Sequence, residues 1–275
     1  MEHNVKTIFL SMLKNYIKFF LHTSLFSLPL LGTQMDLSEK GVNTKSYNLV
    51  YDQPNILITE EAEKLGCSWV NGEVYDKPLI NRFYSLLKNR TGPVTVLDIG
   101  AQTGIFTLLS KFLPGSKWYA FEPIKEAFDI LQLNLRLNNI KNVEVYPYAI
   151  SNRSGRDILK LPEYSRLGLA TLGRKPLRFN QFTLREIECL ELDTFISEKN
   201  ISKVDFVKID TEGWEFFVLQ GGKKMLTRDR PVILMEFVPV NMRQCGICPR
   251  QIIELLNDLN YEWESLEEDI ICTPK

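Results

Sequence analysis

The sequence is poor in histidine. Of its 275 residues only two are histidine, His3 and His22, and both lie near the N-terminus. The side chain that most often acts as a general base near neutral pH is therefore missing from the rest of the chain. Cysteine is scarce as well, with five residues, an odd number scattered over a long chain. This distribution argues against a disulfide framework and favours a reducing compartment, so we expect a cytoplasmic protein.

An excess of one charge is also absent. The chain has 33 Lys and Arg against 34 Asp and Glu, a net charge of −1 at pH 7. It carries no global electrostatic signature of nucleic-acid binding, and we expect no nucleic-acid partner. Hydrophobic residues make up 44% and charged residues 24% of the chain. These fractions predict an ordinary core and exclude wholesale disorder, collagen-like repeats and a polytopic membrane protein, and the length fits one large α/β domain.

A long, uninterrupted hydrophobic run is missing too. Residues 8–31 are the most apolar stretch, but Lys14 and Lys18 interrupt it, so a clean membrane span is not expected. On a helix the polar residues form one basic stripe beside a wide apolar face. Such a helix could pack on the domain, lie on a membrane surface or belong to a secretory signal. We interpret residues 1–45 as this helix and a linker, and 46–275 as the folded domain.

Short β-branched and apolar runs alternate with helical patterns over the last two thirds of the chain. This alternation predicts a parallel sheet that helices cover on both faces. Two final runs are expected to pair as antiparallel strands. We expect strands at 94–99, 117–121, 143–146, 204–209, 231–237, 261–266 and 269–273, and helices at 103–112, 124–138, 214–226 and 249–260.

Residues 151–190 break the alternation. They contain eight Lys or Arg against four Asp or Glu, a local balance of 8 − 4 = +4 in a nearly neutral chain. This basic segment is a candidate for an insertion that covers the substrate. A solvated, irregular excursion is an interpretation at least as well supported, because charge clusters usually face water.

Polar residues gather where predicted strands end, which is the edge at which open α/β sheets bind ligands. Asp98 lies in the first strand, and Gly100 and Gly104 follow it. These glycines permit a tight turn and the close approach of a helix to a ligand, but the third glycine of a dinucleotide fingerprint is missing. Glu122 follows the next strand, 22 residues after Gly100. At that distance an acid reaches the hydroxyls of a ribose, although Glu122 could instead interact favourably with the dipole at the N-terminus of the next helix.

Three further acids are expected at the same edge. Asp210 and Glu212 follow the strand at 204–209, and Glu236 ends the strand after it. With no histidine available, a carboxylate is our candidate for a general base acting on a hydroxyl. The same cluster could instead bind a divalent cation that acidifies the hydroxyl, and we favour the metal-free base. Cys245 and Cys248 form a C-x-x-C pair, but no second pair of ligands has suitable spacing for zinc, so we interpret them as loop residues.

The order of these motifs is more specific than any one of them. The segments VLDIGAQTGIFTLL, FEP, AISN, LDTF, VDFVKIDTEGWEFFVLQGG and ILMEF follow one another over residues 94–240. Together they resemble the FkbM family of S-adenosylmethionine-dependent methyltransferases. The resemblance implies a class I methyltransferase fold, an α/β three-layer sandwich with a mostly parallel seven-stranded sheet whose last strand is antiparallel. It implies S-adenosyl-L-methionine as the methyl donor, and a hydroxyl of a small molecule, sugar or glycan as the acceptor.

The resemblance also implies roles for individual residues. The methionine part of the donor is assigned to the loop after the first strand, the ribose to the acid after the second, and the adenine to the AISN segment. Asp210 would lie near the sulfonium. The donor-binding residues are then Asp98, Gly100, Ala101, Gly104, Glu122, Ala149 and Ser151.

Two alternatives stay open at this point. A dehydrogenase-like nucleotide-binding domain explains neither the missing third glycine nor the pair of Asp210 and Glu212. A methyltransferase that acts on a protein or lipid at a membrane would use residues 8–31 as its surface contact.

Overall fold

The computed structural model describes residues 41–65, 69–70, 73–74, 76–173, 176 and 179–275. The amphipathic helix expected at 8–31 lies outside these residues. Within them, no helix has the length and apolar character needed to cross a bilayer.

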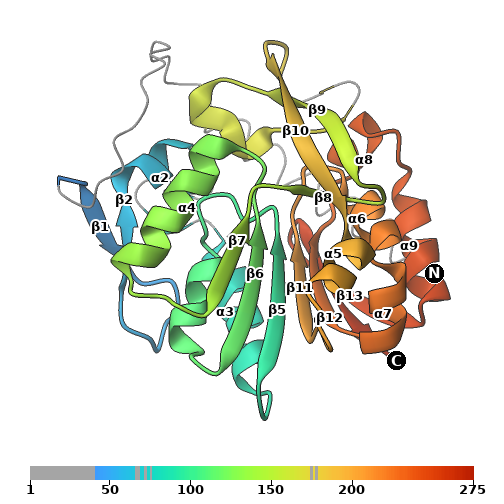
Figure 1. Cartoon of the computed structure of the whole chain (residues 1–275), viewed down its shortest axis with the longest axis horizontal. Coiled ribbons are helices and arrows are strands. Elements are labelled where there is room, and N and C mark those ends of the chain that lie inside the picture. The colour runs from blue at the N-terminus through green and yellow to red at the C-terminus, as the bar shows by residue number, and fades with distance from the viewer. Residues whose placement is uncertain (1–40, 66–68, 71–72, 75, 174–175, 177–178) are drawn as a thin grey trace.

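A seven-stranded sheet forms the centre of the fold (Figure 1). All neighbouring strands in it run parallel except where β14 pairs with β12 on one side and β13 on the other, antiparallel to both. The prediction of a mostly parallel sheet with an antiparallel last strand is confirmed, and so is the pairing of the two final runs. In spatial order the strands are β13 (Tyr261–Leu266), β14 (Asp269–Pro274), β12 (Val232–Glu236), β11 (Phe206–Ile209), β5 (Val94–Ile99), β6 (Ser116–Phe121) and β7 (Val143–Tyr146).

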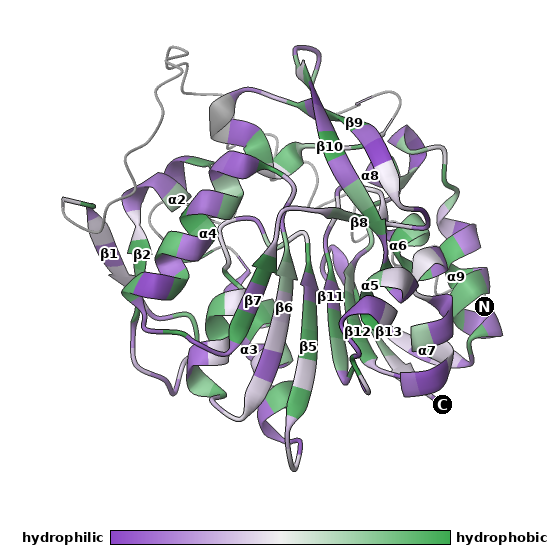
Figure 2. Cartoon of the chain, in the orientation of Figure 1, coloured by the Kyte–Doolittle hydropathy of each residue, from purple (hydrophilic) through white to green (hydrophobic). Residues whose placement is uncertain are grey.

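Helices cover both faces of this sheet, as the alternation predicts. Successive strand residues point to opposite faces, so Val96 joins one buried cluster and its neighbour Leu97 the other. Figure 2 shows the resulting hydrophobic bands along the central strands. The first cluster includes residues of α3 (Lys77–Lys88) and α4 (Lys125–Leu137), and the second those of α5 (Leu192–Glu198), α6 (Glu215–Gly221), α7 (Lys223–Asp229) and α9 (Pro249–Asp258).

Two predicted helices differ from the observed ones. Only a 3-10 helix, η1 (Thr107–Phe112), forms in the segment 103–112, because the turn before it requires positive φ angles at Gln102 (49°) and Gly104 (99°). The segment 214–226 is divided between α6 and α7. Gly221 lies at this break, where a Cβ atom would come within 2.0 Å of the Ser151 carbonyl oxygen.

The segment 151–190 is not an irregular excursion. It forms most of a three-stranded sheet of β8 (Ala149–Ser151), β10 (Thr183–Glu191) and β9 (Gly155–Leu161), which lies above the carboxyl ends of the parallel strands in Figure 1. Some of its basic side chains are neutralised locally. Arg156 pairs with Glu186 at 2.9 Å, and Arg185 forms two hydrogen bonds with Glu126 of α4 at 2.5 and 2.8 Å.

The remaining elements surround this core. They are β1 (Thr44–Tyr47) paired with β2 (Ile56–Thr59), α2 (Glu60–Leu65), β3 (Trp69–Val70) paired with β4 (Glu73–Val74), the 3-10 helix η2 (Tyr164–Leu169) and α8 (Pro239–Gln244).

Candidate active site

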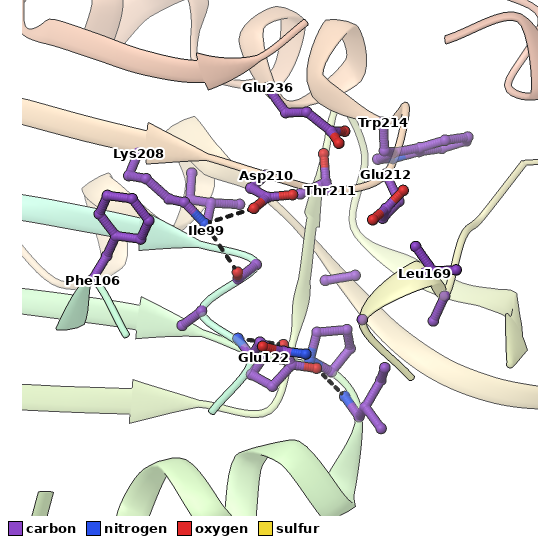
Figure 3. Close-up of a pocket in the computed structure, with 18 of the residues that line it drawn as sticks. Ile99, Phe106, Glu122, Leu169, Lys208, Asp210, Thr211, Glu212, Trp214 and Glu236 are labelled. Carbon is purple, nitrogen blue, oxygen red and sulfur yellow. Dashed lines mark hydrogen bonds and ion pairs between the residues drawn. The ribbon is translucent and has the colours of Figure 1, made fainter. Parts of the chain in front are cut away.

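A cavity of about 190 Å³ opens at the carboxyl ends of the parallel strands (Figure 3). Its wall is built by the loops after β5, β6 and β11, by the end of β12 and by the turn between β13 and β14. The segment after β8 closes it with apolar side chains: Leu159, Leu167, Leu169 and Leu172 line the cavity. Among the described residues of the inserted segment, those that line the cavity are therefore apolar residues and Gly168, and none is an arginine.

The structure brings seven of the ten predicted site residues to this cavity. Asp98, Gly104 and Ser151 do not line it. The residues that do are Gly100, Ala101, Glu122, Ala149, Asp210, Glu212 and Glu236.

Asp98 lies behind the cavity wall. Its side chain is fully buried, accepts a hydrogen bond from the Thr107 hydroxyl at 2.5 Å, and lies 3.9 Å from the Lys208 ammonium. Asp98 and Lys208 are register partners on adjacent parallel strands, so their side chains share one face of the sheet. The Asp98 carboxylate is therefore not part of the cavity lining.

The two glycines of the first loop have different roles. Gly100 lines the cavity, has a φ of 78°, and approaches β11 so closely that a Cβ atom would lie 1.8 Å from the Asp210 carbonyl oxygen. Gly104 permits the packing of α4, because its Cβ atom would lie 2.4 Å from Leu131. The third residue outside the cavity, Ser151, accepts a hydrogen bond from the Trp214 indole at 3.1 Å.

Glu122 lies in the cavity wall and is only 4% exposed. One carboxylate oxygen accepts a hydrogen bond from the Gln102 amide and the other from the Ile124 amide, both at 2.8 Å. Burial raises the pKa of Glu122 to about 7, against the opposing effect of these two N–H donors. Because Ile124 directly precedes α4, Glu122 accepts a hydrogen bond at the N-terminal end of this helix and also faces the cavity.

Lys208 is a buried cation in the wall of the same cavity and was missed by sequence reasoning. Its ammonium lies 3.1 Å from the Asp210 carboxylate, donates to the Gly100 carbonyl at 3.4 Å and lies 5.0 Å from the centre of the Phe106 ring. Burial alone would lower the pKa of Lys208, but the carboxylates of Asp210 and Asp98 outweigh it and raise the pKa above its usual range. A lysine within a four-residue strand whose other residues are all apolar was the available signal.

The three acids predicted as catalytic come together. Oxygen atoms of Asp210, Glu212 and Glu236 lie within 4.8 Å of one another, on the side of the cavity opposite Glu122 in Figure 3. The Asn241 amide of α8 links two of them. Its Nδ2 donates to Glu212 at 2.7 Å and to both oxygens of Glu236 at 3.2 Å. Asn241 is fully buried, so it fixes the separation of these two carboxylates.

The loop that carries Glu212 is held in an unusual conformation. Glu212 has a φ of 52°, in the left-handed region, and its carbonyl oxygen accepts hydrogen bonds from Thr171 at 2.9 Å and from Gln244 at 3.0 Å. From the other side, one oxygen of the buried Glu215 accepts three hydrogen bonds, from the amide and hydroxyl of Thr211 and from the Gly213 amide. Burial raises the pKa of Glu215 to about 7. These contacts aim the Glu212 side chain into the cavity.

The C-x-x-C pair takes no part in this cluster. Cys245 is buried, with its sulfur 3.8 Å from the Thr171 hydroxyl, whereas Cys248 is exposed at the start of α9. Within the described residues, the acids 210, 212 and 236 are the one group with metal-ligand spacing, and neither cysteine belongs to it.

Comparison with known proteins identifies the family of the chain. The model of the methyltransferase FkbM domain matches residues 98–263, more than half of the chain. The chain belongs to this family. The resemblance seen in its motifs is thus confirmed, and the protein is an S-adenosylmethionine-dependent methyltransferase of the FkbM family.

Several proteins that are similar in sequence are named as methyltransferases. Methyltransferase sdnD of Sordaria araneosa is 24% identical over 243 residues, which are 78% of this chain and 91% of that protein. The 2-O-methyltransferase NoeI of Sinorhizobium fredii (strain NBRC 101917 / NGR234) is 26% identical over 191 residues, covering 64% of this chain and 76% of NoeI. A solved candidate O-methyltransferase from Klebsiella pneumoniae aligns with a TM-score of 0.50 at 14% identity, over 78% of this chain and 87% of that one, and shows the shared fold.

The charges of the cavity fit the methyl donor of this FkbM methyltransferase. Among its described lining residues, eight carry carboxylates and Lys208 alone carries an ammonium or guanidinium group. S-adenosylmethionine brings an ammonium, a sulfonium and one carboxylate, a net positive charge that an acidic wall stabilises, and no phosphates. The eight acids are Asp76, Glu122, Asp210, Glu212, Glu236, Glu267, Glu268 and Asp269.

Proposed function

We propose that the protein transfers the methyl group of S-adenosylmethionine to a hydroxyl oxygen of a small molecule or sugar. The observation that carries this proposal is the convergence of Asp210, Glu212 and Glu236 at the end of the cavity away from Glu122. A hydroxyl must lose its proton during methyl transfer, and in this cavity the available acceptors of that proton are carboxylates. The name of the relative NoeI, a 2-O-methyltransferase, supports the choice of oxygen.

The donor would be bound by residues that follow β5 and β6 and by a residue of β8. Glu122 accepts the ribose hydroxyls, Gly100 and Ala101 contact the amino-acid part, and Ala149 lies beside the adenine, all four being cavity residues. The donor supplies a methyl group on a positively charged sulfur. The main contribution of the chain is to hold the acceptor oxygen in line with that methyl group, and such alignment lowers a barrier by up to about 7–11 kcal/mol.

Asp210 and Glu236 have different roles in the reaction. Asp210 is paired with the Lys208 ammonium at 3.1 Å and faces the cavity, where its carboxylate would stabilise positive charge on the donor. Glu236, which shares the Asn241 amide with Glu212, is our choice for the base. The hydroxyl oxygen forms a bond to the methyl carbon, the carbon–sulfur bond breaks with its electron pair moving to sulfur, and the proton passes to Glu236.

The test is the variant Glu236→Gln, which keeps the shape and removes the base. We expect turnover to fall by about 10²–10⁴-fold, the usual contribution of a general base, while the dissociation constant of S-adenosylmethionine changes less than twofold. Asp258→Asn, at an exposed position on α9, is the matched control and should keep full activity. Unchanged turnover in Glu236→Gln would refute its role as the base.

A chelator separates this mechanism from its alternative. We expect EDTA to leave the wild-type rate unchanged. If EDTA abolishes activity and magnesium or calcium restores it, Asp210, Glu212 and Glu236 are ligands of a divalent cation that acidifies the hydroxyl.

A further inference from the structure

One part of the cavity wall has no role in the reaction described above. At the end of η2 and just after it, the cavity is lined with hydrocarbon by Leu169, Ala170 and Leu172, which we call the apolar roof. Leu172 belongs to a hydrophobic core cluster, whereas the equally buried Leu169 belongs to neither cluster. Among the described residues that line the cavity, no other buried apolar side chain lies outside both clusters. Leu169 is thus the apolar side chain that can pack against a ligand and is not part of the core.

A hydrogen bond places the apolar roof beside the loop that carries Glu212. Thr171 lies within the sequence of the roof and is fully buried, and its hydroxyl donates to the Glu212 carbonyl at 2.9 Å. Its two neighbours in the chain, both residues of the roof, are one Cα spacing of about 3.8 Å away. Figure 3 shows Leu169 and Glu212 on the same side of the cavity, facing the ends of the parallel strands.

The segment that follows the roof packs on the helix that holds the acids. At Gly173 a Cβ atom would lie 3.0 Å from the Gln244 carbonyl oxygen at the end of α8. The same helix carries Asn241, whose amide donates to Glu212 and Glu236. The apolar roof is therefore joined to the acid cluster from two directions, through the loop of Glu212 and through α8.

A different leucine of the inserted segment covers the donor side. Leu159 of β9 also lines the cavity, and its register partner on β10 is Arg185. Directly paired residues of antiparallel strands share one face of the sheet, and Arg185 binds Glu126 in the first turn of α4. Because Glu122 accepts a hydrogen bond at the start of the same helix, Leu159 lies toward the ribose end and the apolar roof toward the acids.

An apolar surface beside the acids restricts the molecules that can be methylated. The reacting hydroxyl must reach the carboxylates, while the atoms next to it lie against the hydrocarbon of the roof. An unmodified sugar would bury its other hydroxyls against leucine without hydrogen-bond partners, which is unfavourable. Hydrocarbon next to the reacting hydroxyl would instead gain free energy by leaving water.

We propose that the apolar roof selects an amphiphilic acceptor, whose reacting hydroxyl is flanked by hydrocarbon, over an unmodified sugar. The inference rests on the proposed O-methyl transfer and names its substrate class. The hydrocarbon can be a hydroxylated chain or ring, or the apolar group that a sugar carries. Their shared chemistry is an apolar face beside the hydroxyl. Leu169 is then a specificity-determining residue, because its side chain lines the cavity and lies outside both core clusters.

The first test compares acceptors that differ in polarity. The small molecules of a cell extract are divided between water and 1-butanol, and both pools are assayed for transfer of a tritiated methyl group from S-adenosylmethionine. Amphiphiles enter the butanol and unmodified sugars stay in the water. We expect the butanol pool to accept at least ten times as much methyl group as the aqueous pool. A smaller ratio, or acceptance mainly in the aqueous pool, would overturn the inference.

Variants tie this preference to the apolar roof. Leu169→Asn replaces hydrocarbon by an amide of similar size and should lower kcat/KM for the butanol pool at least tenfold, with the dissociation constant of S-adenosylhomocysteine within twofold. Leu169→Met keeps both volume and apolarity and should retain kcat/KM within threefold. Leu184→Asn makes the same change as Leu169→Asn at a 65% exposed position of β10 and should alter neither quantity.

Two outcomes of this comparison contradict the inference. If Leu169→Asn weakens S-adenosylhomocysteine tenfold and keeps the preference for the butanol pool, the roof covers the donor and does not select the acceptor. If Leu169→Asn does not fold, Leu169→Ala, which only shortens the hydrocarbon, takes its place. An unchanged kcat/KM in Leu169→Ala would then overturn the role of Leu169.

A binding measurement separates this inference from the proposed reaction. No methyl transfer to either pool, by a protein that binds S-adenosylhomocysteine, would contradict the reaction. The roof is then judged by calorimetry of the S-adenosylhomocysteine-loaded protein with hexyl β-D-glucoside and methyl β-D-glucoside, which carry the same sugar. Each buried methylene strengthens binding by up to about fourfold, so we expect the hexyl glucoside to bind at least tenfold more tightly and Leu169→Asn to lose this advantage. Equal affinities, or an advantage that Leu169→Asn retains, would overturn the inference.

Discussion

The substitution Lys208→Met tests how the centre of the site is held together. It removes a buried ammonium that lies 3.1 Å from Asp210 and 3.9 Å from Asp98. At an effective dielectric constant of about 20 these separations correspond to about 5 and 4 kcal/mol of attraction. The Asp210 side chain is 43% exposed, so water screens much of its share, whereas Asp98 is fully buried. We expect the free energy of unfolding to fall by about 3 kcal/mol, as is usual when one partner of a buried pair is removed.

The loss should depend on pH, with a sign that follows from Asp98. Burial already raises the pKa of Asp98, and Lys208 opposes that effect. Without Lys208 the folded-state pKa rises further above the unfolded value of about 3.9. A carboxyl with a raised folded-state pKa favours the folded state at low pH and loses this contribution as the pH rises. The loss of unfolding free energy in Lys208→Met is therefore largest near neutral pH and becomes smaller as the pH is lowered.

Urea denaturation at pH 7.5 and pH 5 measures both effects. Adding Asp98→Asn to Lys208→Met should recover part of the lost stability, since no unpaired buried charge then remains behind the loop of Gly100. A loss below about 1 kcal/mol, or a double variant no more stable than Lys208→Met, would refute this account of the buried pair.

Three further predictions concern the donor, the base and the N-terminal segment. Glu122→Ala should raise the dissociation constant of S-adenosylmethionine at least tenfold by calorimetry, since charge-assisted hydrogen bonds contribute about 1.5–3 kcal/mol each. Because burial raises the pKa of Glu122 to about 7, wild-type binding should strengthen as the pH rises through 7, and the variant should lose this dependence. Asn241→Ala removes the donor shared by Glu212 and Glu236, so kcat should fall at least tenfold with little change in donor binding. We propose a cytoplasmic protein that can touch membranes through residues 8–31. Deleting residues 1–40 should abolish liposome flotation and leave donor binding unchanged, and flotation of the truncated protein would refute that contact.

The acids at the edge of the sheet were predictable because the ends of strands follow from local patterns. Glu122, Asp210 and Glu236 each directly follow or end a buried strand, so parallel pairing brings them to one side of the fold. Asp98 illustrates where this reasoning fails. It lies one residue before the end of β5, and strand alternation turns its side chain to Lys208 and Thr107 and away from the cavity.

The residues that sequence reasoning missed depend on contacts between distant segments. Asn241 reaches the acids only because α8 folds back beside the loop of Glu212, and no periodic pattern marks that return. Asp76 and Asp269 are far apart in the sequence and both line the cavity, because α3 and β14 contribute buried residues to the same core cluster. Lys208 was visible as a lysine in a buried strand, but its partners follow from the register of β11 against β5.

The pair of Asp98 and Lys208 also fixes the register between strands β5 and β11. Parallel strands that are buried on both faces are made of similar apolar residues, so their hydrophobic pattern distinguishes one alignment from the next only weakly. In β5 and β11 the observed alignment sets Lys208 beside Asp98, and a shift by one residue would set it beside Leu97 or Ile99. The same shift, about 3.3 Å, would separate Gly100 from the Asp210 carbonyl oxygen that it nearly touches. A buried charge pair thus aligns the donor loop with the acids at the sheet edge before any ligand enters.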